Sequence, residues 1–277
     1  DQAARFCVLL LLLSSFSLAM RSLSLRCMAS AGLRHGARSS SAARWYAAAA
    51  GPRVEVDQNR KLIEISPGDE SRHSATCIFM HGLGDSANGF AGLCHSFATE
   101  MPYMRFVCPT APTSPVTLNG GMPMTSWYDI KGLDDRSLES CDGIEESRAI
   151  IEGLLATEAA RVGYDRCVLA GFSQGGAMAL YVGLQAESKL AGILSMSAYL
   201  PKPDSIVLGP HASETPILQC HGEDDAMVRI STARRTEEYL VSAGINIRAF
   251  HAYPNLGHSV HDEEIQDVRD WLTEVLP

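Results

Sequence analysis

A serine flanked by glycines is the residue of this chain with the clearest potential for chemistry. Residues 171–175 read Gly-Phe-Ser-Gln-Gly; the apolar run 167–170 precedes them and the helix-compatible run 177–182 follows. Strand, sharp turn and helix form the context in which a strained turn exposes a serine hydroxyl as a nucleophile. The pattern therefore predicts a nucleophile at Ser173. A glycine-rich connection with a solvent-facing serine would read the same locally, so the prediction depends on finding a base and an acid elsewhere.

Histidines in the C-terminal part of the chain are the candidates for the base. A serine hydroxyl needs a proton acceptor at neutral pH, and this is commonly a histidine held by a carboxylate. His251 falls inside the last strand pattern and His261 begins the last helix pattern, which favours structural or surface roles. His258 lies in the loop between these elements, from which a side chain can reach back over the sheet edge. We therefore predict His258 as the base.

Four carboxylates compete for the role of the orienting acid: Asp204, Glu223, Asp224 and Asp225. The last three follow an apolar strand pattern at 216–220, which is where the chain order serine, acid, histidine requires the acid. Position favours Asp225 over Asp224, because Asp225 lies closer to the next apolar residues. The alternative is a solvated acidic loop.

Two backbone N–H groups are expected to stabilise the negative charge that develops on the attacked carbonyl oxygen. One belongs to Gln174, the residue after the nucleophile. The other is assigned to Leu83 in the sequence His-Gly-Leu-Gly at 81–84, whose glycines let the backbone turn inwards. Neither glycine-rich loop carries a phosphate-binding fingerprint.

Strand and helix patterns alternate along the body of the chain and must position these residues. Strands are expected near 54–56, 62–65, 75–80, 105–108, 167–170, 193–197, 216–220 and 246–253, and helices near 90–97, 144–162, 177–182, 231–243 and 262–276. Such alternation predicts an α/β fold with a mostly parallel central sheet and helices on both faces. The Pro- and Gly-rich segment 109–143 lacks the pattern and exceeds the usual loop length, which indicates a lid or a pocket wall.

Composition divides the chain near residue 52. A short apolar stretch close to the N-terminus is followed by residues 20–50, which are rich in Ser, Ala and Arg and contain no acidic residue. A two-part targeting signal, a mitochondrial presequence that starts at an internal methionine, and a disordered extension are the alternatives. We expect residues 1–52 to be a targeting or disordered extension and residues 53–277 to form one catalytic domain.

The charge distribution excludes some classes of partner. The chain has 23 basic and 32 acidic residues, and seven of the basic residues fall within 1–53, so the body is strongly acidic. An acidic body repels nucleic acid and disfavours firm docking on anionic lipid, which leaves at most a transient contact with a membrane surface. No segment of the body is apolar and long enough to predict a transmembrane helix.

The eight cysteines show neither metal-site spacing nor a disulfide framework. Their scatter favours a reducing compartment, cytoplasmic or organellar. Cys77, Cys108, Cys167 and Cys220 fall in apolar strand patterns, so we expect them to be buried as small apolar side chains.

Several motifs follow one another in order along the body. They are FMHGLGD at 79–85, CPTAP at 108–112, PVTLN at 115–119, MP at 122–123, SWYD at 126–129, GFSQGG at 171–176, QCHG at 219–222 and GHS at 257–259. Together they resemble the acyl-protein thioesterase/lysophospholipase family of phospholipase/carboxylesterase-type α/β-hydrolases, from about residue 55 to the C-terminus. The resemblance implies the α/β-hydrolase fold. It also implies Ser173 as nucleophile, Asp225 rather than Asp224 as acid, and His258 as base.

The resemblance implies a serine hydrolase that cleaves acyl thioesters or esters, so we expect an acyl-protein thioesterase that depalmitoylates proteins. A lysophospholipase or a small-molecule carboxylesterase is the alternative within the same class. A non-catalytic binding protein on the same fold is the alternative from another class, and the ordered Ser, Asp and His argue against it. Family members use no metal and no cofactor, so none is expected, and the partner implied is an acylated protein or lipid substrate.

Met122, Met124 and Trp127 are predicted to line an acyl groove, with packing under the long loop as the alternative. Two departures from the family pattern concern the pocket rather than the catalytic residues. Tyr199 stands where the family carries tryptophan, and Asp225 lacks the proline that often follows it.

Overall fold

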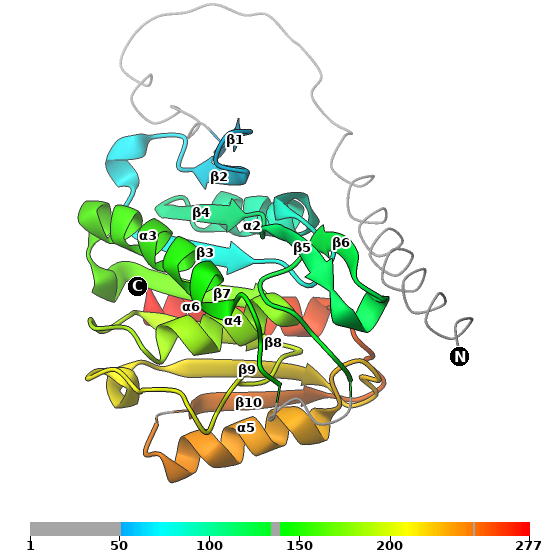
Figure 1. Ribbon diagram of the computed structural model, residues 1–277. Helices are drawn as coiled ribbons and strands as arrows, with labels where there is room; N and C mark the ends of the chain where they lie inside the picture. The colour runs from blue at the N-terminus through cyan, green and yellow to red at the C-terminus, as the bar shows by residue number, and fades with distance from the viewer. Residues whose placement is uncertain (1–50, 134–138, 246) are drawn as a thin grey trace, which may run out of the picture. The chain divides into compact units, whose positions relative to one another are not determined.

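The computed structural model describes residues 51–133, 139–245 and 247–277 (Figure 1). Residues 1–50, which make up nearly all of the predicted extension, lie outside the described residues, so that prediction stays open. The segment Gly51–Pro277 forms one compact unit.

An eight-stranded sheet runs through the described part of the chain (Figure 1). Its strands are β1 (Arg53–Asp57), β2 (Leu62–Ser66), β3 (Ala75–Met80), β4 (Met104–Pro109), β7 (Cys167–Phe172), β8 (Gly192–Met196), β9 (Ile217–Gly222) and β10 (Ile247–Tyr253). The strand order is β1-β2-β4-β3-β7-β8-β9-β10. All pairs from β4 to β10 are parallel, whereas β2 is antiparallel to both β1 and β4. The predicted α/β fold with a mostly parallel sheet is confirmed.

Helices cover both faces of this sheet. They are α2 (Ala87–Glu100), α3 (Ile144–Val162), α4 (Gln174–Gly183), α5 (Ile230–Ser242) and α6 (Asp262–Val275). Figure 1 shows α3 and α4 in front of the strands and α2 and α6 behind them. Leu240 of α5 belongs to the same apolar cluster as Ile151 of α3 and Leu180 of α4, so α5 covers the face that carries α3 and α4.

The central strands are buried along their whole length and consist mostly of apolar residues, because both of their faces are covered. Every residue of β3 and of β7 is buried. Cys77, Cys108, Cys167 and Cys220 are free and buried, as the sequence predicts. Burial raises the pKa of the Cys77 thiol well above its usual value, so this thiol is inert.

The adjacent strands β3 and β7 mark the point at which the strand order reverses. The chain leaves β3 for β4 on one side and leaves β7 for β8 on the other. Met80 pairs with Gly171 at the carboxyl ends of these strands. Open α/β sheets bind their ligands outside the carboxyl ends of strands at such a reversal. The fold therefore directs attention to the loops that follow β3 and β7.

The described part of the segment 109–143 contains more regular structure than expected. It contains a two-stranded antiparallel hairpin, β5 (Thr113–Val116) and β6 (Met122–Thr125), in addition to irregular backbone. Pro115 pairs with Pro123 across this hairpin. Because proline lacks an N–H and is rare inside sheets, these residues hide the strand pattern in the sequence.

Candidate active site

The segment that follows β7 forms a sharp turn at Ser173. This residue has φ 55° and ψ −121°, a left-handed backbone region that is strained for a residue with a side chain. Its N–H donates to Met196 O at 2.8 Å, and its carbonyl accepts from Ala177 N at 3.0 Å as α4 begins. A side chain at Gly171 would overlap the backbone of Gly175, so the turn requires glycine there.

Ser173, His258 and Asp225 form one hydrogen-bonded chain. His258 Nε2 lies 2.9 Å from Ser173 Oγ, and His258 Nδ1 lies 2.7 Å from Asp225 Oδ2. The three residues follow β7, β10 and β9, whose carboxyl ends meet at one edge of the sheet. Because Nδ1 donates to the carboxylate, Nε2 of the neutral imidazole is oriented to accept the serine proton.

Asp225 is almost completely buried, with 4% of the residue exposed. Its Oδ1 accepts hydrogen bonds from the N–H groups of Met227 and Val228, both at 2.8 Å. Burial acts to raise the pKa of this carboxyl, but the hydrogen bond and the charge of His258 outweigh burial, and the pKa is lowered. Asp224 is exposed. The geometry therefore places Asp225, and not Asp224, behind the histidine.

The competing histidines have other partners. His251 Nδ1 lies 2.7 Å from Asp267 Oδ2 on α6. His261 precedes α6, and its Nδ1 accepts from Glu264 N at 3.3 Å. These contacts agree with the structural role that the sequence favours for His251, and they show that His261, for which a surface position was favoured, caps α6.

The N–H groups of Leu83, in the loop after β3, and of Gln174, at the start of α4, both adjoin Ser173. A Cβ at Gly82, the residue before Leu83, would lie 3.3 Å from Ser173 Cβ. Gln174 is the first residue of α4, so its N–H has no acceptor within the helix. Within the described residues neither N–H donates a hydrogen bond. Stabilisation of an oxyanion requires two such N–H groups, without another acceptor, beside the serine hydroxyl.

His81 was not predicted to have a functional role, and the structure places it directly under this loop. The residue is 1% exposed. Its Nε2 accepts from Ala111 N at 3.0 Å, which leaves Nδ1 as the protonated nitrogen that donates to Gly82 O at 2.7 Å. Burial lowers the pKa of His81, which favours this neutral form. The sequence signal is its position between a buried strand and a glycine-rich turn.

His221 occupies a comparable place beneath the acid. It is 1% exposed and lies at the end of β9. Its Nε2 donates to Val228 O at 2.7 Å and is 3.6 Å from Asp225 Oδ2. Burial lowers the pKa of His221, so the ring supports the acid loop as a neutral donor.

The three residues predicted to line an acyl groove occupy different environments. Met122 on β6 is 44% exposed. Met124 is half-buried, and its Sδ would contact a Cβ at Gly84 at 3.8 Å, close to the loop of Leu83. Trp127 is 1% exposed and lies in the core. Its burial does not fit a groove wall, because a side chain without accessible surface cannot line an open groove.

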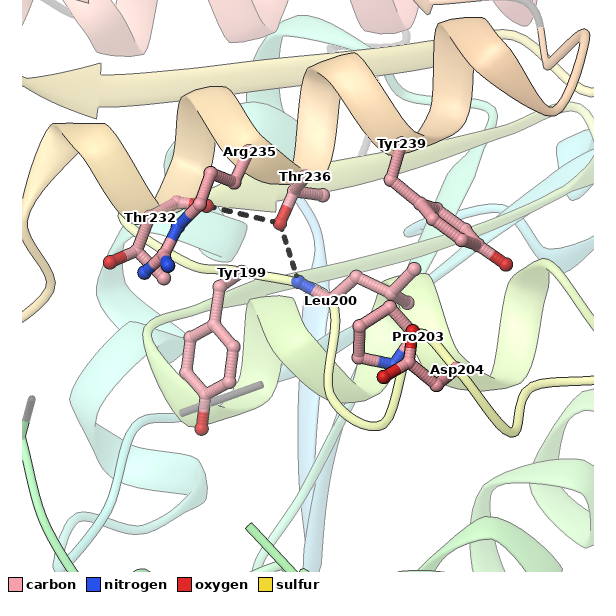
Figure 2. A pocket seen from close by; sticks show the side chains of 8 residues that line it. All are labelled: Tyr199, Leu200, Pro203, Asp204, Thr232, Arg235, Thr236 and Tyr239. Atoms are coloured by element: carbon pink, nitrogen blue, oxygen red, sulfur yellow. Dashed lines mark hydrogen bonds between the residues drawn. The ribbon is translucent and has the colours of Figure 1, made fainter. Parts of the chain in front are cut away.

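A cavity of about 190 Å³ lies between the segment after β8 and helix α5 (Figure 2). Its lining residues are Tyr199, Leu200, Pro203, Asp204, Thr232, Arg235, Thr236 and Tyr239. Leu200 N donates to Thr236 Oγ1 at 2.9 Å, which fixes the segment on the helix. Neither predicted groove methionine lines this cavity.

Two further properties concern the part of the chain that the structure describes. In that part no helix combines the length and the apolar character needed to cross a bilayer. Nor does any group of three or more His, Cys, Asp or Glu side chains gather there as ligands for a metal ion.

The fold and the hydrogen-bonded serine, histidine and aspartate define a serine hydrolase of the α/β-hydrolase type. The family described as Phospholipase/Carboxylesterase matches residues 63–276, and the chain belongs to this family. The predicted family, fold and enzyme class are thereby confirmed.

Relatives with known names agree with this assignment. Acyl-protein thioesterase 1 of Neurospora crassa is 39% identical, and the match covers 75% of this chain and 89% of that protein. Acyl-protein thioesterase 1 homolog 1 of Dictyostelium discoideum is also 39% identical, over 74% of this chain and 92% of that protein. The crystal structure of Zea mays acyl-protein thioesterase 2 superimposes with a TM-score of 0.70 at 31% identity, covering 78% of this chain and 99% of that chain.

Proposed function

We propose that this serine hydrolase is an acyl-protein thioesterase in which Ser173 is the nucleophile, His258 the base and Asp225 the orienting acid. The observation that carries the proposal is the hydrogen-bonded chain from Ser173 Oγ through the imidazole to Asp225 Oδ2. The names of the relatives support the substrate class, since they are acyl-protein thioesterases at 35–39% identity over most of this chain.

The reaction has two steps. In the first, Ser173 Oγ attacks the acyl carbonyl carbon while its proton passes to His258 Nε2, and the carbonyl oxygen becomes an oxyanion held by the N–H groups of Leu83 and Gln174. The C–S bond then breaks, and the imidazolium proton goes to the departing thiolate. In the second step the imidazole removes a proton from water as the water oxygen attacks the acyl-enzyme; the bond from the acyl carbon to Ser173 Oγ then breaks, the imidazolium returns the proton to Oγ, and the fatty acid leaves.

Asp225 stabilises the imidazolium that forms in each step. Its burial and its two backbone hydrogen bonds fix the carboxylate, while its lowered pKa keeps it ionised at neutral pH. A thiolate is a good leaving group, so the site needs no acid beyond His258. No step requires a metal or a cofactor, and chelators are expected to leave the rate unchanged.

Labelling with a fluorophosphonate tests the catalytic assignment. The wild-type protein should react at a single serine, and Ser173→Ala should lose both labelling and hydrolysis while its circular dichroism and melting temperature stay close to those of the wild type. A folded Ser173→Ala variant that retains turnover would remove Ser173 from the mechanism.

A substrate panel tests the acyl-thioester specificity. Palmitoyl-cysteine peptides, lysophospholipids and short-chain esters should be compared on one preparation by kcat/KM. We expect the palmitoyl peptide to be preferred. A preference for lysophospholipid would make the protein a lysophospholipase, and a preference for short esters would make it a small-molecule carboxylesterase, with the same serine in each case.

A further inference from the structure

One short segment connects the loop of Leu83 with the start of α4, the two places that carry the N–H groups without an acceptor among the described residues. Residues Thr125–Tyr128 start at the last residue of β6, and we call them the bridging segment. One end meets the loop of Leu83, since Gly84 N donates to Thr125 O at 2.8 Å. Its other residues meet the side chain of Gln174, as described below.

The Gln174 side chain forms its hydrogen bonds with the bridging segment. It is 2% exposed. Its Oε1 accepts from Trp127 N at 2.9 Å, and its Nε2 donates to Tyr128 O at 2.7 Å and to Ser126 Oγ at 3.1 Å. A buried amide with its donors and acceptor in use fixes the position of the backbone around it, because breaking any of these bonds leaves a buried polar group unpaired.

Trp127 extends the connection back to the first loop. Its indole N–H donates to His81 O at 2.9 Å, and the two rings lie 5.4 Å apart between centroids. His81 in turn donates to Gly82 O, next to Leu83. A continuous path of hydrogen bonds therefore leads from the side chain of Gln174 through Trp127 to the backbone beside Leu83.

We propose that the Gln174 side chain is a positioning residue for the oxyanion hole: through the bridging segment and Trp127 it fixes the separation between the N–H groups of Gln174 and Leu83. This inference rests on the proposed function, in which those two groups hold the oxyanion. Trp127 belongs to the same hydrogen-bonded path, and this role accounts for its burial. Preorganised donors are effective only when their positions are fixed before the charge develops.

Gln174→Met tests the proposal, because it keeps the length of the side chain and the backbone N–H but removes all three hydrogen bonds. Gln185→Met is the matched control. Gln185 lies just after α4, is 8% exposed, donates to Tyr181 O at 2.8 Å and accepts from Arg148 at 2.9 Å. Both variants should melt at a lower temperature than the wild type, since both leave buried groups unpaired.

The kinetic constants separate positioning from general destabilisation. We expect kcat of Gln174→Met to fall about 10- to 100-fold with KM nearly unchanged, because displaced donors weaken binding of the transition state alone. The inhibition constant of an acyl trifluoromethyl ketone, whose adduct places an oxyanion in the hole, should rise by a similar factor. Gln185→Met should change neither quantity.

Several outcomes would overturn the inference. Unchanged kcat and inhibitor affinity in Gln174→Met would remove the side chain from positioning, and equal losses in Gln185→Met would make the effect a general one. The end point of fluorophosphonate labelling keeps the two proposals apart: a wild-type protein that is not labelled contradicts the proposed function, whereas full labelling of all variants without a kinetic difference contradicts only the positioning role.

Trp127→Phe keeps the proposal testable if Gln174→Met does not fold. The substitution retains an aromatic ring and removes the hydrogen bond to His81 O. We expect kcat to fall on the order of 10-fold, equally for acetyl and palmitoyl thioesters. A loss confined to the palmitoyl substrate would make Trp127 part of the acyl site instead and would overturn its role in the bridging segment.

Discussion

The ring of Phe172 packs against the ring of His258, with centroids 4.9 Å apart and planes inclined by 46°. Phe172 also contacts Phe90 of α2 at 5.6 Å, and Phe90 stacks on Phe79 of β3 at 4.7 Å. The imidazole proposed as the base therefore rests on a row of aromatic rings that begins in the core of the sheet. Its orientation is set from one side by Asp225 and from the other by this row.

Phe172→Leu should lower kcat/KM about 10-fold, because the smaller side chain lets the imidazole turn away from Ser173. Phe97→Leu is the control, since Phe97 is buried on α2 and packs against Phe106 rather than against the site. Steady-state kinetics and melting temperatures of both variants check the prediction. Equal kinetic losses would show that any cavity behind the sheet has this effect.

Asp225→Asn should lower kcat by about 10⁴-fold, because an amide can present its N–H₂ to His258 Nδ1 and so stabilise the wrong tautomer. Asp224→Asn, one residue earlier and exposed, should retain nearly full activity. The ratio of the two rates on one thioester substrate is the measurement. The reverse ranking would move the acid to Asp224.

Glu264 predicts a pH dependence of stability. It is fully buried on α6, and burial raises its pKa to about 8. Between the ordinary glutamate pKa and that value the unfolded chain loses a proton that the folded chain keeps, so wild-type stability falls as pH rises from about 4.5 to 8. Glu264→Gln has no carboxyl group to ionise at this position. Its free energy of unfolding should therefore exceed that of the wild type by an amount that grows toward pH 8, where it is on the order of 4 kcal/mol.

Urea unfolding of the wild type and Glu264→Gln at pH 5, 6, 7 and 8 checks this prediction. The exposed neighbour Glu263→Gln serves as the control and should follow the wild type at every pH. If the difference in unfolding free energy between Glu264→Gln and the wild type is the same at every pH, Glu264 does not ionise between pH 5 and 8 and the prediction is wrong.

Replacement of Arg105, on β4, should cause a large loss of stability. Arg105 is 6% exposed and lies 3.0 Å from Glu64 and 3.3 Å from the buried Glu158. Arg105→Met should cost about 3–5 kcal/mol, because it removes the buried cation beside the buried Glu158, whose other cation, Arg161, is exposed and lies 3.8 Å away. Arg53→Met, which removes an exposed pair with Glu70, should cost less than about 1 kcal/mol. Chemical unfolding at neutral pH compares the two, and equal losses would contradict the argument.

A chain that begins at residue 52 should be soluble and should retain the full kcat/KM. The first strand starts at Arg53, and Gly51–Pro277 forms a compact unit by itself. Size-exclusion chromatography and thioester kinetics of this shortened chain and the full chain test the expectation. A large loss of activity on removal of residues 1–51 would assign them a role in the catalytic domain.

Local patterns were sufficient to predict much of this structure. Strand-like patterns, apolar runs for the central strands and mixed ones for β1 and β10, predicted a strand near each strand of the large sheet, and the spacing of apolar residues predicted the helix at 144–162 with the bounds that α3 has. Chain order predicted Ser173 and His258 and limited the acid to a few candidates, because these residues lie in loops after strands whose carboxyl ends share one edge; the family resemblance then decided for Asp225 over Asp224.

The parts that could not be predicted depend on contacts between distant residues. The hairpin β5–β6 was hidden by Pro115 and Pro123, which read as a loop. Trp127 lies in a Pro-rich segment and gives no local sign that α3 and α4 cover it. The three partners of the Gln174 side chain lie 46 to 48 residues away in the sequence, so no motif or periodicity reveals them.

The order in which the chain supplies its reactive groups has a consequence for biosynthesis. Ser173, in the turn after β7, is synthesised before His258, which follows β10, the strand at the sheet edge. A ribosome-bound chain that has already folded around β3 and β7 would thus carry a strained but unactivated serine. We expect the nascent protein to remain inactive as a hydrolase until β10 has joined the sheet and the loop that carries His258 has reached Ser173.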